Sequence, residues 1–400
     1  MIAPTCDGDD VGEAWLAHQW ASLLSEQSEL TLVTSHKRDH RPASQQLDGV
    51  RVVEWPEPPV VGRFERFNSL LQPGYARFYT HARRWIRSRL AEGERWDVAH
   101  QVIPAAMRYP SPAAALGIPL VVGPIGGSLA SPPGFVVEEG AAPWYQRLRR
   151  LDAVRLRHDP LLRRTFESAD CVVGIAPYVE ELLEGVSVRR FECMGDVALH
   201  AVPPPVDRAG RTGPVRLLHV GRIVRTKGLR DVIRAMHALD DLDIVLDVLG
   251  EGGDRAACEA LIGEYGLTDR VVMHGRVSRN AVDEFYARAD VFVFPSYREP
   301  GGSVVLEAMS WGLPLIVCDR GGPASSADGD CALMLPARSP EQLAADCATA
   351  VRTLVEDRAL RLRMGAAARE RAAREHLWSR RVERMTGLYD ELSSPIPRIG

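Results

Sequence analysis

Six short apolar runs follow one another in the second half of the chain, with amphipathic helical segments between them. The runs cover residues 215–220, 243–249, 271–274, 291–294, 314–317 and 332–335. Strands that alternate with helices in this way form βαβ units, whose parallel strands share one sheet. In the commonest strand order of such sheets, 3-2-1-4-5-6, the first and fourth strands are neighbours, and a ligand crevice opens at their carboxyl ends. The rhythm therefore predicts a Rossmann-like domain with its site between those two strands.

The loop after the first of these strands runs from Gly221 to Gly228 and carries Arg222 and Lys227. The chain contains 49 Lys plus Arg, and only Lys37 and Lys227 among them are lysines. An ammonium is a compact cation suited to a diphosphate. We therefore predict that Arg222 and Lys227 bind phosphate; the alternative is a solvated loop face.

The loop after the fourth strand places Glu299 and Glu307 on either side of Gly301, Gly302 and Ser303, where a helix is predicted to begin. Backbone N–H groups at a helix start favour anions, and glycines let a phosphate or sugar approach the main chain. Carboxylates accept hydrogen bonds from sugar hydroxyls. The two loops together predict a nucleotide-sugar site.

The two motifs, Gly-Arg-x4-Lys-Gly at 221–228 and Glu-x7-Glu at 299–307, resemble those of glycosyltransferase family 4. The resemblance extends to Asp97-Val98-Ala99-His100, to the linker 202–207 and to a closing helix at 378–392. It implies the GT-B fold, in which two doubly wound Rossmann-like domains face each other across a cleft and a C-terminal helix crosses back to the first domain.

The resemblance also implies a role for each site residue. Arg222 and Lys227 would hold the donor diphosphate and help it depart, and Glu299 would lie against the donor sugar. Fixed cations of this kind stabilise the charge that builds on a leaving group. The donor-binding residues implied are Gly221, Gly250, Gly301, Gly302, Ser303 and Glu307, the last for the ribose hydroxyls. The family retains the anomeric configuration and needs no bound metal or cofactor, and we expect no cluster with metal-ligand spacing.

The first half of the chain predicts a second α/β domain. Its apolar runs cover residues 30–34, 50–54, 97–100, 118–123 and 170–175. We expect an acceptor-side domain at 1–203, a donor-binding domain at 204–375 and a closing helical segment at 376–400, with Pro203 to Pro205 stiffening the linker. Met1 to Pro4 read as the end of a first strand shorter than the usual five or so residues. We expect either a start upstream of Met1 or a weakly held domain.

Acceptor-side candidates come from loops of the first domain. Many relatives have a histidine after the strand at 118–122, but this chain has Gly126 and Gly127 there, so no catalytic role is transferred to that position. Gly12 and Glu13 follow the first strand stub, and His100 ends another strand. The alternatives are a purely structural turn at Gly126 and Gly127, a surface acid at Glu13, and a structural histidine with satisfied hydrogen bonds at His100.

Composition limits the class of protein. A formal net charge of −4 argues against a nucleic-acid binder. Seven scattered cysteines without a Cys-x-x-Cys indicate reduced thiols in the cytoplasm, and no run of about 18 apolar residues predicts a membrane span. Arginine-rich segments at 63–89 and 144–164 could touch anionic lipid at the inner face of the membrane, or simply cover an ordinary domain.

The sequence therefore favours a retaining hexosyltransferase that moves a sugar from a nucleotide-diphosphate sugar to an acceptor. The donor is expected to be a UDP or GDP sugar, and the acceptor a lipid, a saccharide or a small metabolite. A sugar-nucleotide epimerase of similar fold is one alternative, and an inactive nucleotide-sugar-binding relative is another.

Overall fold

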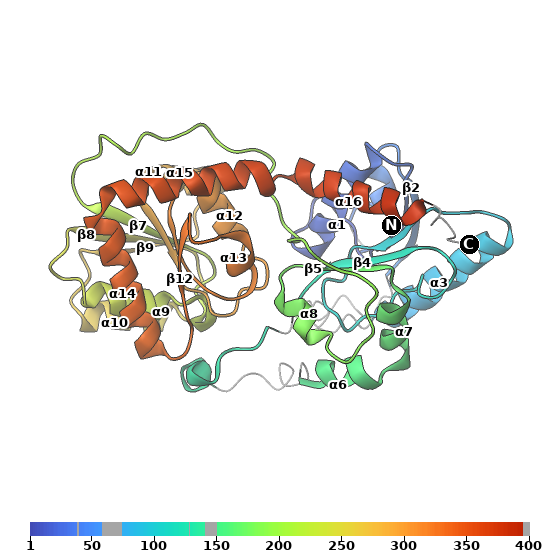
Figure 1. The fold of residues 1–400 in the computed structure, drawn as a ribbon, viewed down its shortest axis with the longest axis horizontal. Helices are drawn as coiled ribbons and strands as arrows, with labels where there is room; N and C mark the ends of the chain where they lie inside the picture. Colours follow the sequence, from blue (N-terminus) through green and yellow to red (C-terminus); the bar gives the residue numbers. More distant parts are fainter. Residues whose placement is uncertain (38–39, 58–73, 128, 141–149, 395–400) are drawn as a thin grey trace, which may run out of the picture. The chain divides into compact units, whose positions relative to one another are not determined.

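The computed structural model describes the chain except residues 38–39, 58–73, 128, 141–149 and 395–400. The chain divides into two compact units (Figure 1). The first unit comprises Met1–Ser128, Trp144–Asp196 and Arg381–Gly400, and the second comprises Leu129–Pro143 and Val197–Arg380. The second unit thus takes a short segment, Leu129–Pro143, from the middle of the first half of the sequence.

The second unit contains one six-stranded parallel sheet. Its strands are β7 (Val215–Val220), β8 (Ile244–Leu249), β9 (Val271–Gly275), β10 (Val291–Phe294), β11 (Leu315–Cys318) and β12 (Ala332–Leu335). They lie in the order β12-β11-β10-β7-β8-β9. This is the 3-2-1-4-5-6 order expected from the sequence, and β7 and β10 are neighbours, with Val291 paired to Leu217.

Helices cover both faces of this sheet, and each face has its own apolar core (Figure 1). One face packs against α9 (Leu229–His237), α10 (Arg255–Glu264) and α14 (Pro340–Glu356). The other packs against α11 (Arg279–Arg288), α12 (Ser303–Ser310) and α15 (Arg358–Glu375), with α13 (Gly321–Ser326) beside β11. The strands are apolar on both sides because both faces are buried.

Asp357 separates α14 from α15, and its carboxylate caps α15 by accepting a hydrogen bond from the Leu360 N–H at 2.7 Å. Helix α15 continues without a break through Gly365. An ideal Cβ on Gly365 would lie 2.4 Å from the carbonyl oxygen of Gly312. The glycine therefore serves close packing between α15 and the end of α12.

The first unit contains two short parallel ladders. Strands β1 (Thr31–His36) and β2 (Arg51–Pro56) form one, and β3 (Ala99–Gln101), β4 (Leu120–Ile125), β5 (Cys171–Gly174) and β6 (Phe191–Cys193) form the other. Ile2 bridges Val33 on one side and Gln101 on the other. The stub at Met1 to Pro4 thus holds the place of a central strand. The sequence did not predict β6.

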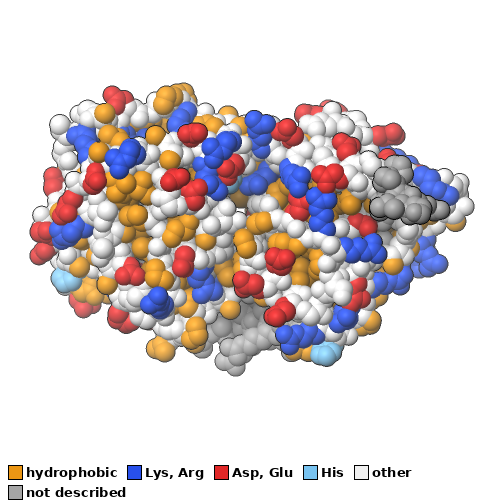
Figure 2. All heavy atoms as spheres, viewed as in Figure 1, with side chains coloured by type: hydrophobic (Ala, Val, Ile, Leu, Met, Phe, Trp, Pro, Cys, Tyr) orange, Lys and Arg blue, Asp and Glu red, His pale blue; other side chains and the backbone are white. Residues whose placement is uncertain are grey.

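Helices surround the ladders of the first unit. They are α1 (Glu13–Ser25), α3 (Tyr75–Ala91), α6 (Arg150–His158), α7 (Pro160–Ser168), α8 (Tyr178–Leu182) and α16 (Trp378–Ser393), which joins this unit from Arg381 onward. Within the described ranges, no helix has both the length and the apolar character to cross a bilayer. Acidic and basic side chains are intermingled on the face shown in Figure 2.

Candidate nucleotide-sugar site

The loops that follow β7 and β10, at the carboxyl edge of the second unit's sheet, contact each other closely. Gly228, which precedes α9, has φ 79°, and an ideal Cβ there would lie 2.2 Å from the carbonyl oxygen of Pro295. The hydroxyl of Ser296 donates a hydrogen bond to the carbonyl oxygen of Thr226 at 3.0 Å. Only glycine fits such an approach at positive φ. The loops that follow β7 and β10 are therefore held in one place, as the strand order requires.

Lys227 and Glu299 meet where these loops join. The ammonium of Lys227 donates a hydrogen bond to a carboxylate oxygen of Glu299, and it lies 5.7 Å from the centroid of the Phe294 ring. Lys227 is only 8% exposed. A buried ammonium needs such a partner because desolvation of an unpaired charge is costly. The structure thus brings together the predicted cation and the predicted sugar-side carboxylate.

Arg222 and Arg225 lie in the same loop but differ in environment. Arg222 is exposed, and no carboxylate pairs with it among the described residues. Arg225 is buried, and its guanidinium bonds the carboxylate of Asp231 at 2.7 and 2.9 Å and that of Glu138 at 2.7 Å. Burial alone would lower the pKa of Arg225, but these carboxylates outweigh it and raise that pKa. Arg222 is free to meet a ligand, whereas Arg225 is committed to the fold.

Segment 129–143 contacts the loop after β7 at Arg225 and the loop after β10 at Tyr297. Its 3-10 turn, η3 (Pro133–Phe135), and its one-turn helix, α4 (Val136–Glu139), lie against the second unit's own residues. Phe135 stacks on Tyr297 with ring centroids 4.0 Å apart, and the Arg225 guanidinium lies over both rings at 5.3 and 5.5 Å. Sequence reasoning missed this cluster, because no local pattern links Phe135 to residues more than 80 positions away.

Gly250 and Gly221 fix the ends of β7 and β8. Gly250 has φ 134°, and an ideal Cβ there would lie 1.8 Å from the carbonyl oxygen of Gly221. The Gly221 N–H donates to the Leu249 carbonyl at 3.0 Å, and the Gly250 N–H donates to the Gly275 carbonyl at 2.8 Å. Because neither residue has a side chain, the backbones at the ends of β7 and β8 can pack in direct contact as the chain leaves each strand. Both predicted glycines thus lie at the sheet edge beside Arg222.

Helix α12 begins at the second loop. Gly302 is its N-cap, with φ 90°, and Ser303 is its exposed first residue. The first N–H groups of a helix have no partner within the helix, so they can bond an anion or a sugar oxygen. Gly301 lies against Gly322, where an ideal Cβ would be 1.8 Å from the Gly301 carbonyl oxygen.

Glu307 lies in α12 and receives two donors from α11. Arg279 bonds one carboxylate oxygen at 2.8 Å, and the Tyr286 hydroxyl bonds the other at 3.1 Å. Burial raises the pKa of Tyr286 well above its usual range, so the phenol stays protonated and can donate. Sequence reasoning found Glu307 but neither of its partners, although their spacing of seven residues on one helix was a usable signal.

Three acceptor-side candidates lie together in the first unit. The Ala105 N–H donates to a carboxylate oxygen of Glu13 at 3.2 Å, and the Gly126 N–H donates to the Ala105 carbonyl at 2.7 Å. Gly127, with φ 96°, donates its N–H to the Tyr178 hydroxyl at 3.2 Å. Gly12, with φ 69°, precedes α1. Ser128, the next residue of this loop, lies outside the described residues.

His100 is buried and hydrogen-bonded in the way expected of a structural histidine. It is 3% exposed, with Nδ1 2.6 Å from the Tyr389 hydroxyl and Nε2 bonded to the Gly123 carbonyl. Burial lowers the pKa of His100 to about 4, so the imidazole is neutral near pH 7. Both ring nitrogens are occupied, and we leave His100 out of the proposed site.

One group of metal-ligand type occurs among the described residues. Ligand atoms of Asp7, Asp10 and His40 lie within 4.8 Å of one another. His40 Nδ1 is 2.6 Å from an Asp7 carboxylate oxygen, and Lys37 pairs with Asp10. No local motif indicates this group, because His40 lies 30 positions after Asp10. The Lys37 cation already compensates part of the carboxylate charge.

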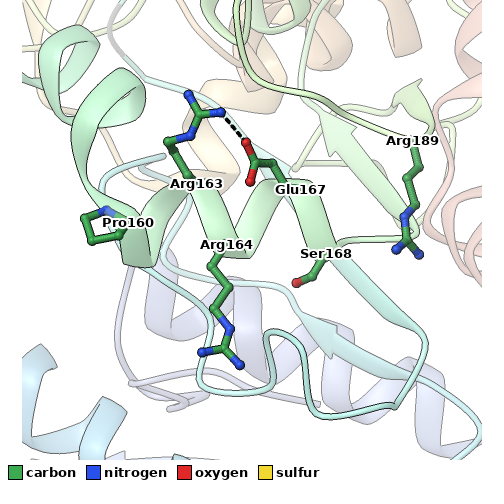
Figure 3. A pocket seen from close by; sticks show the side chains of 6 residues that line it. All are labelled: Pro160, Arg163, Arg164, Glu167, Ser168 and Arg189. Carbon is green, nitrogen blue, oxygen red and sulfur yellow. Dashed lines mark hydrogen bonds and ion pairs between the residues drawn. The ribbon is translucent and has the colours of Figure 1, made fainter.

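A surface hollow of about 420 Å³ lies along α7 in the first unit (Figure 3). It is lined by Pro160, Arg163, Arg164, Glu167, Ser168 and Arg189. Arg163 pairs with Glu167, and Arg189 pairs with Asp170 at 2.7 Å. This hollow contains none of the predicted site residues.

Residues 207–371 match the family model described as Glycosyl transferases group 1. Sucrose-phosphate synthase from Thermosynechococcus elongatus has a similar structure, with a TM-score of 0.63 and 20% identity over 98% of this chain and 96% of that one. The apo form of the lipopolysaccharide outer core galactosyltransferase WaaB has a TM-score of 0.65 and 14% identity over 98% of both chains. The chain has the GT-B fold.

In sequence, this GT-B chain is similar to alpha-D-kanosaminyltransferase from Streptomyces kanamyceticus. The two are 33% identical over 180 residues, which is 44% of this chain and 45% of that protein. The match therefore spans less than half of the relative's own length. The candidate site, from Gly221 to Glu307, lies within the residues that match the family model.

Proposed function

We propose that this protein is a glycosyltransferase that moves a sugar from a nucleotide-diphosphate sugar to an acceptor. One observation carries the proposal: the loops after β7 and β10 place Lys227, Glu299 and the start of α12 at the point where the strand order reverses. Ligands of open α/β sheets bind at such a switch point. The family match over residues 207–371 supports the same conclusion.

The site's own residues account for the chemistry as follows. Arg222 and Lys227 stabilise the negative charge that develops on the departing diphosphate. Backbone N–H groups near Gly302 and Ser303 donate hydrogen bonds to the phosphate or the sugar. Cations fixed before the reaction stabilise this charge without reorganisation. Glu299, which accepts a hydrogen bond from Lys227, lies against the donor sugar. Glu307 takes the ribose hydroxyls.

The finer assignments are also part of the proposal. The transferred group is a hexose from a UDP or GDP sugar, the anomeric configuration is retained, and no metal ion takes part. The acceptor, a lipid, a saccharide or a small metabolite, meets the first unit near Glu13, Gly126 and Gly127. The comparisons lend no support to an epimerase.

A cytoplasmic location, with contact to anionic lipid at the inner membrane face, completes the proposal. The contact would involve the arginine-rich segments 63–89 and 144–164, of which residues 63–73 and 144–149 lie outside the described residues. Flotation with vesicles of mixed anionic and neutral lipid at low salt tests it. Protein that stays at the bottom of the gradient would remove this part of the proposal.

The first experiment is a thermal-shift panel with UDP, GDP, ADP and TDP and their common sugars. A ligand that binds only the folded protein raises its melting temperature. A shift with one diphosphate supports the site and names the donor base. Product analysis then separates the functions: free diphosphate with a new glycoside indicates transfer, and an altered nucleotide-sugar indicates epimerisation. A shift with no product over several acceptors would favour an inactive binding relative.

A further inference from the structure

Helix α11 directs two hydrogen-bond donors at one carboxylate of α12. Arg279 and Tyr286 are seven residues apart, which is close to two helical turns, so they project from the same side of the helix. Their donor atoms reach different oxygens of Glu307, at 2.8 Å from Arg279 and 3.1 Å from Tyr286. A carboxylate gripped at both oxygens cannot rotate freely about its last bond.

The two donors are unequal. Tyr286 is fully buried, whereas the side chain of Arg279 is 69% exposed. The Tyr286 hydroxyl also lies 3.3 Å from the Val304 carbonyl oxygen. A phenol has a single hydrogen, and the charged carboxylate is the stronger acceptor. The buried Tyr286 is therefore the donor that orients the Glu307 carboxylate more firmly, because the exposed Arg279–Glu307 ion pair is screened by water.

We propose that Tyr286, assisted by Arg279, is a positioning residue that presets the Glu307 carboxylate to receive the two neighbouring hydroxyls of a ribose. A carboxylate offers about four lone-pair sites. One donor on each oxygen leaves one lone-pair site on each oxygen for a second donor, which suits a vicinal diol. An acceptor that is already oriented loses less freedom on binding than a mobile one. This inference rests on the proposed function, in which Glu307 faces the ribose.

The test is a comparison of ligands across variants. Calorimetry measures the Kd of UDP and 2′-deoxy-UDP, and of GDP and 2′-deoxy-GDP, for the natural protein and for Tyr286→Phe. Hydrogen bonds to a charged group predict that the natural protein binds the ribonucleotide on the order of tenfold tighter. Tyr286→Phe keeps the ring but loses the donor, and we expect the preference to fall to about twofold or less.

Tyr265→Phe is the matched control. Tyr265 follows α10 and stacks on His237 at 4.4 Å, away from Glu307. This variant should keep the full preference for the ribonucleotide. Arg279→Met supplies a second test at an exposed position, and it should reduce the preference by a smaller factor, should Tyr286→Phe fold poorly.

Each outcome decides a different question. If both Tyr286→Phe and Arg279→Met weaken the binding of ribo- and deoxynucleotides equally, the ribose preference is intact. That result would overturn the positioning role and leave the proposed function standing. A natural protein that binds diphosphates without any ribose preference would instead refute the assignment of Glu307. A natural protein that binds none of the four nucleotides would overturn the donor site itself.

Discussion

The ammonium of Lys227 and the carboxylate of Glu299 are hydrogen-bonded to each other across 72 positions of the sequence. The carboxylate thus neutralises the cation that is proposed to meet the diphosphate. In the proposed function, the donor diphosphate competes with Glu299 for the ammonium. The exchange would release the carboxylate at the moment when a sugar arrives beside it.

Lys227→Ala should slow sugar transfer by about a hundredfold or more, because one fixed cation at a developing anion is worth that much. Arg222→Ala should have a similar effect. Initial rates at saturating donor measure both. Arg352→Ala, which removes an exposed arginine that pairs with Asp241 on another part of the second unit, is the control and should keep the natural rate. A Lys227→Ala protein with unchanged turnover would refute the phosphate assignment.

Gly250→Ala should lower the free energy of unfolding by about 2 kcal/mol or more, because the new Cβ meets the Gly221 carbonyl at positive φ. Gly263→Ala, in α10, has nothing within 4 Å of its Cβ and should instead gain up to about 1 kcal/mol. Urea unfolding compares the two. Equal stabilities would contradict the close approach of the strand ends.

Arg225→Met should destabilise the second unit by roughly 3 kcal/mol, because the buried carboxylate of Asp231 loses two hydrogen bonds and keeps only the 3.1 Å contact from Arg234. Arg352→Met breaks an exposed ion pair and should leave the melting temperature nearly unchanged. Thermal unfolding with nucleotide absent measures both. Similar melting temperatures for the two variants would show that the Arg225 cluster is not a structural one.

Stability should fall as the pH drops from about 6.5 to about 4. Burial lowers the pKa of His219 from 6.5 to about 4, so the unfolded chain binds more protons than the folded one in this window. Each such histidine contributes a slope of up to about 1.4 kcal/mol per pH unit. His219→Asn should reduce the slope measured by urea unfolding at several pH values. An unchanged slope would mean that His219 titrates normally in the folded protein.

Transfer should proceed at the same rate in EDTA and in Mg²⁺, because Arg222 and Lys227 supply the charge that a metal would otherwise supply. Rates in the two buffers measure this. Activity lost in EDTA and restored by a divalent ion would contradict metal independence. Asp7→Asn would then show whether the group of Asp7, Asp10 and His40 holds the ion.

Much of the second unit could be predicted because its information is local. The strands at 215–220, 291–294 and 332–335 were predicted with the observed bounds, since each is an apolar run between turn residues. The strand order then places Lys227 near Glu299 without any further assumption. Spacing and topology together were sufficient for this part of the site.

The rest depends on contacts between distant residues. The burial of Arg225 cannot be predicted from its spacing, since the carboxylates that hold it belong to Asp231 and to Glu138, which is 87 positions away. The partners of Glu307 come from another helix. Strand β6 has three residues and a half-exposed pattern, which is too short for a periodic signal. Tertiary packing, not local pattern, determines all three.

The segment Leu129–Pro143 has a consequence for anyone who divides this protein. A fragment that begins at Val197 and ends at Arg380 would keep the whole six-stranded sheet but lose Phe135 and Glu138. The face of Tyr297 would then be open to water, and Arg225 would keep only Asp231 of its two carboxylate partners. A fragment that keeps the complete second unit must therefore combine two separate stretches of the sequence.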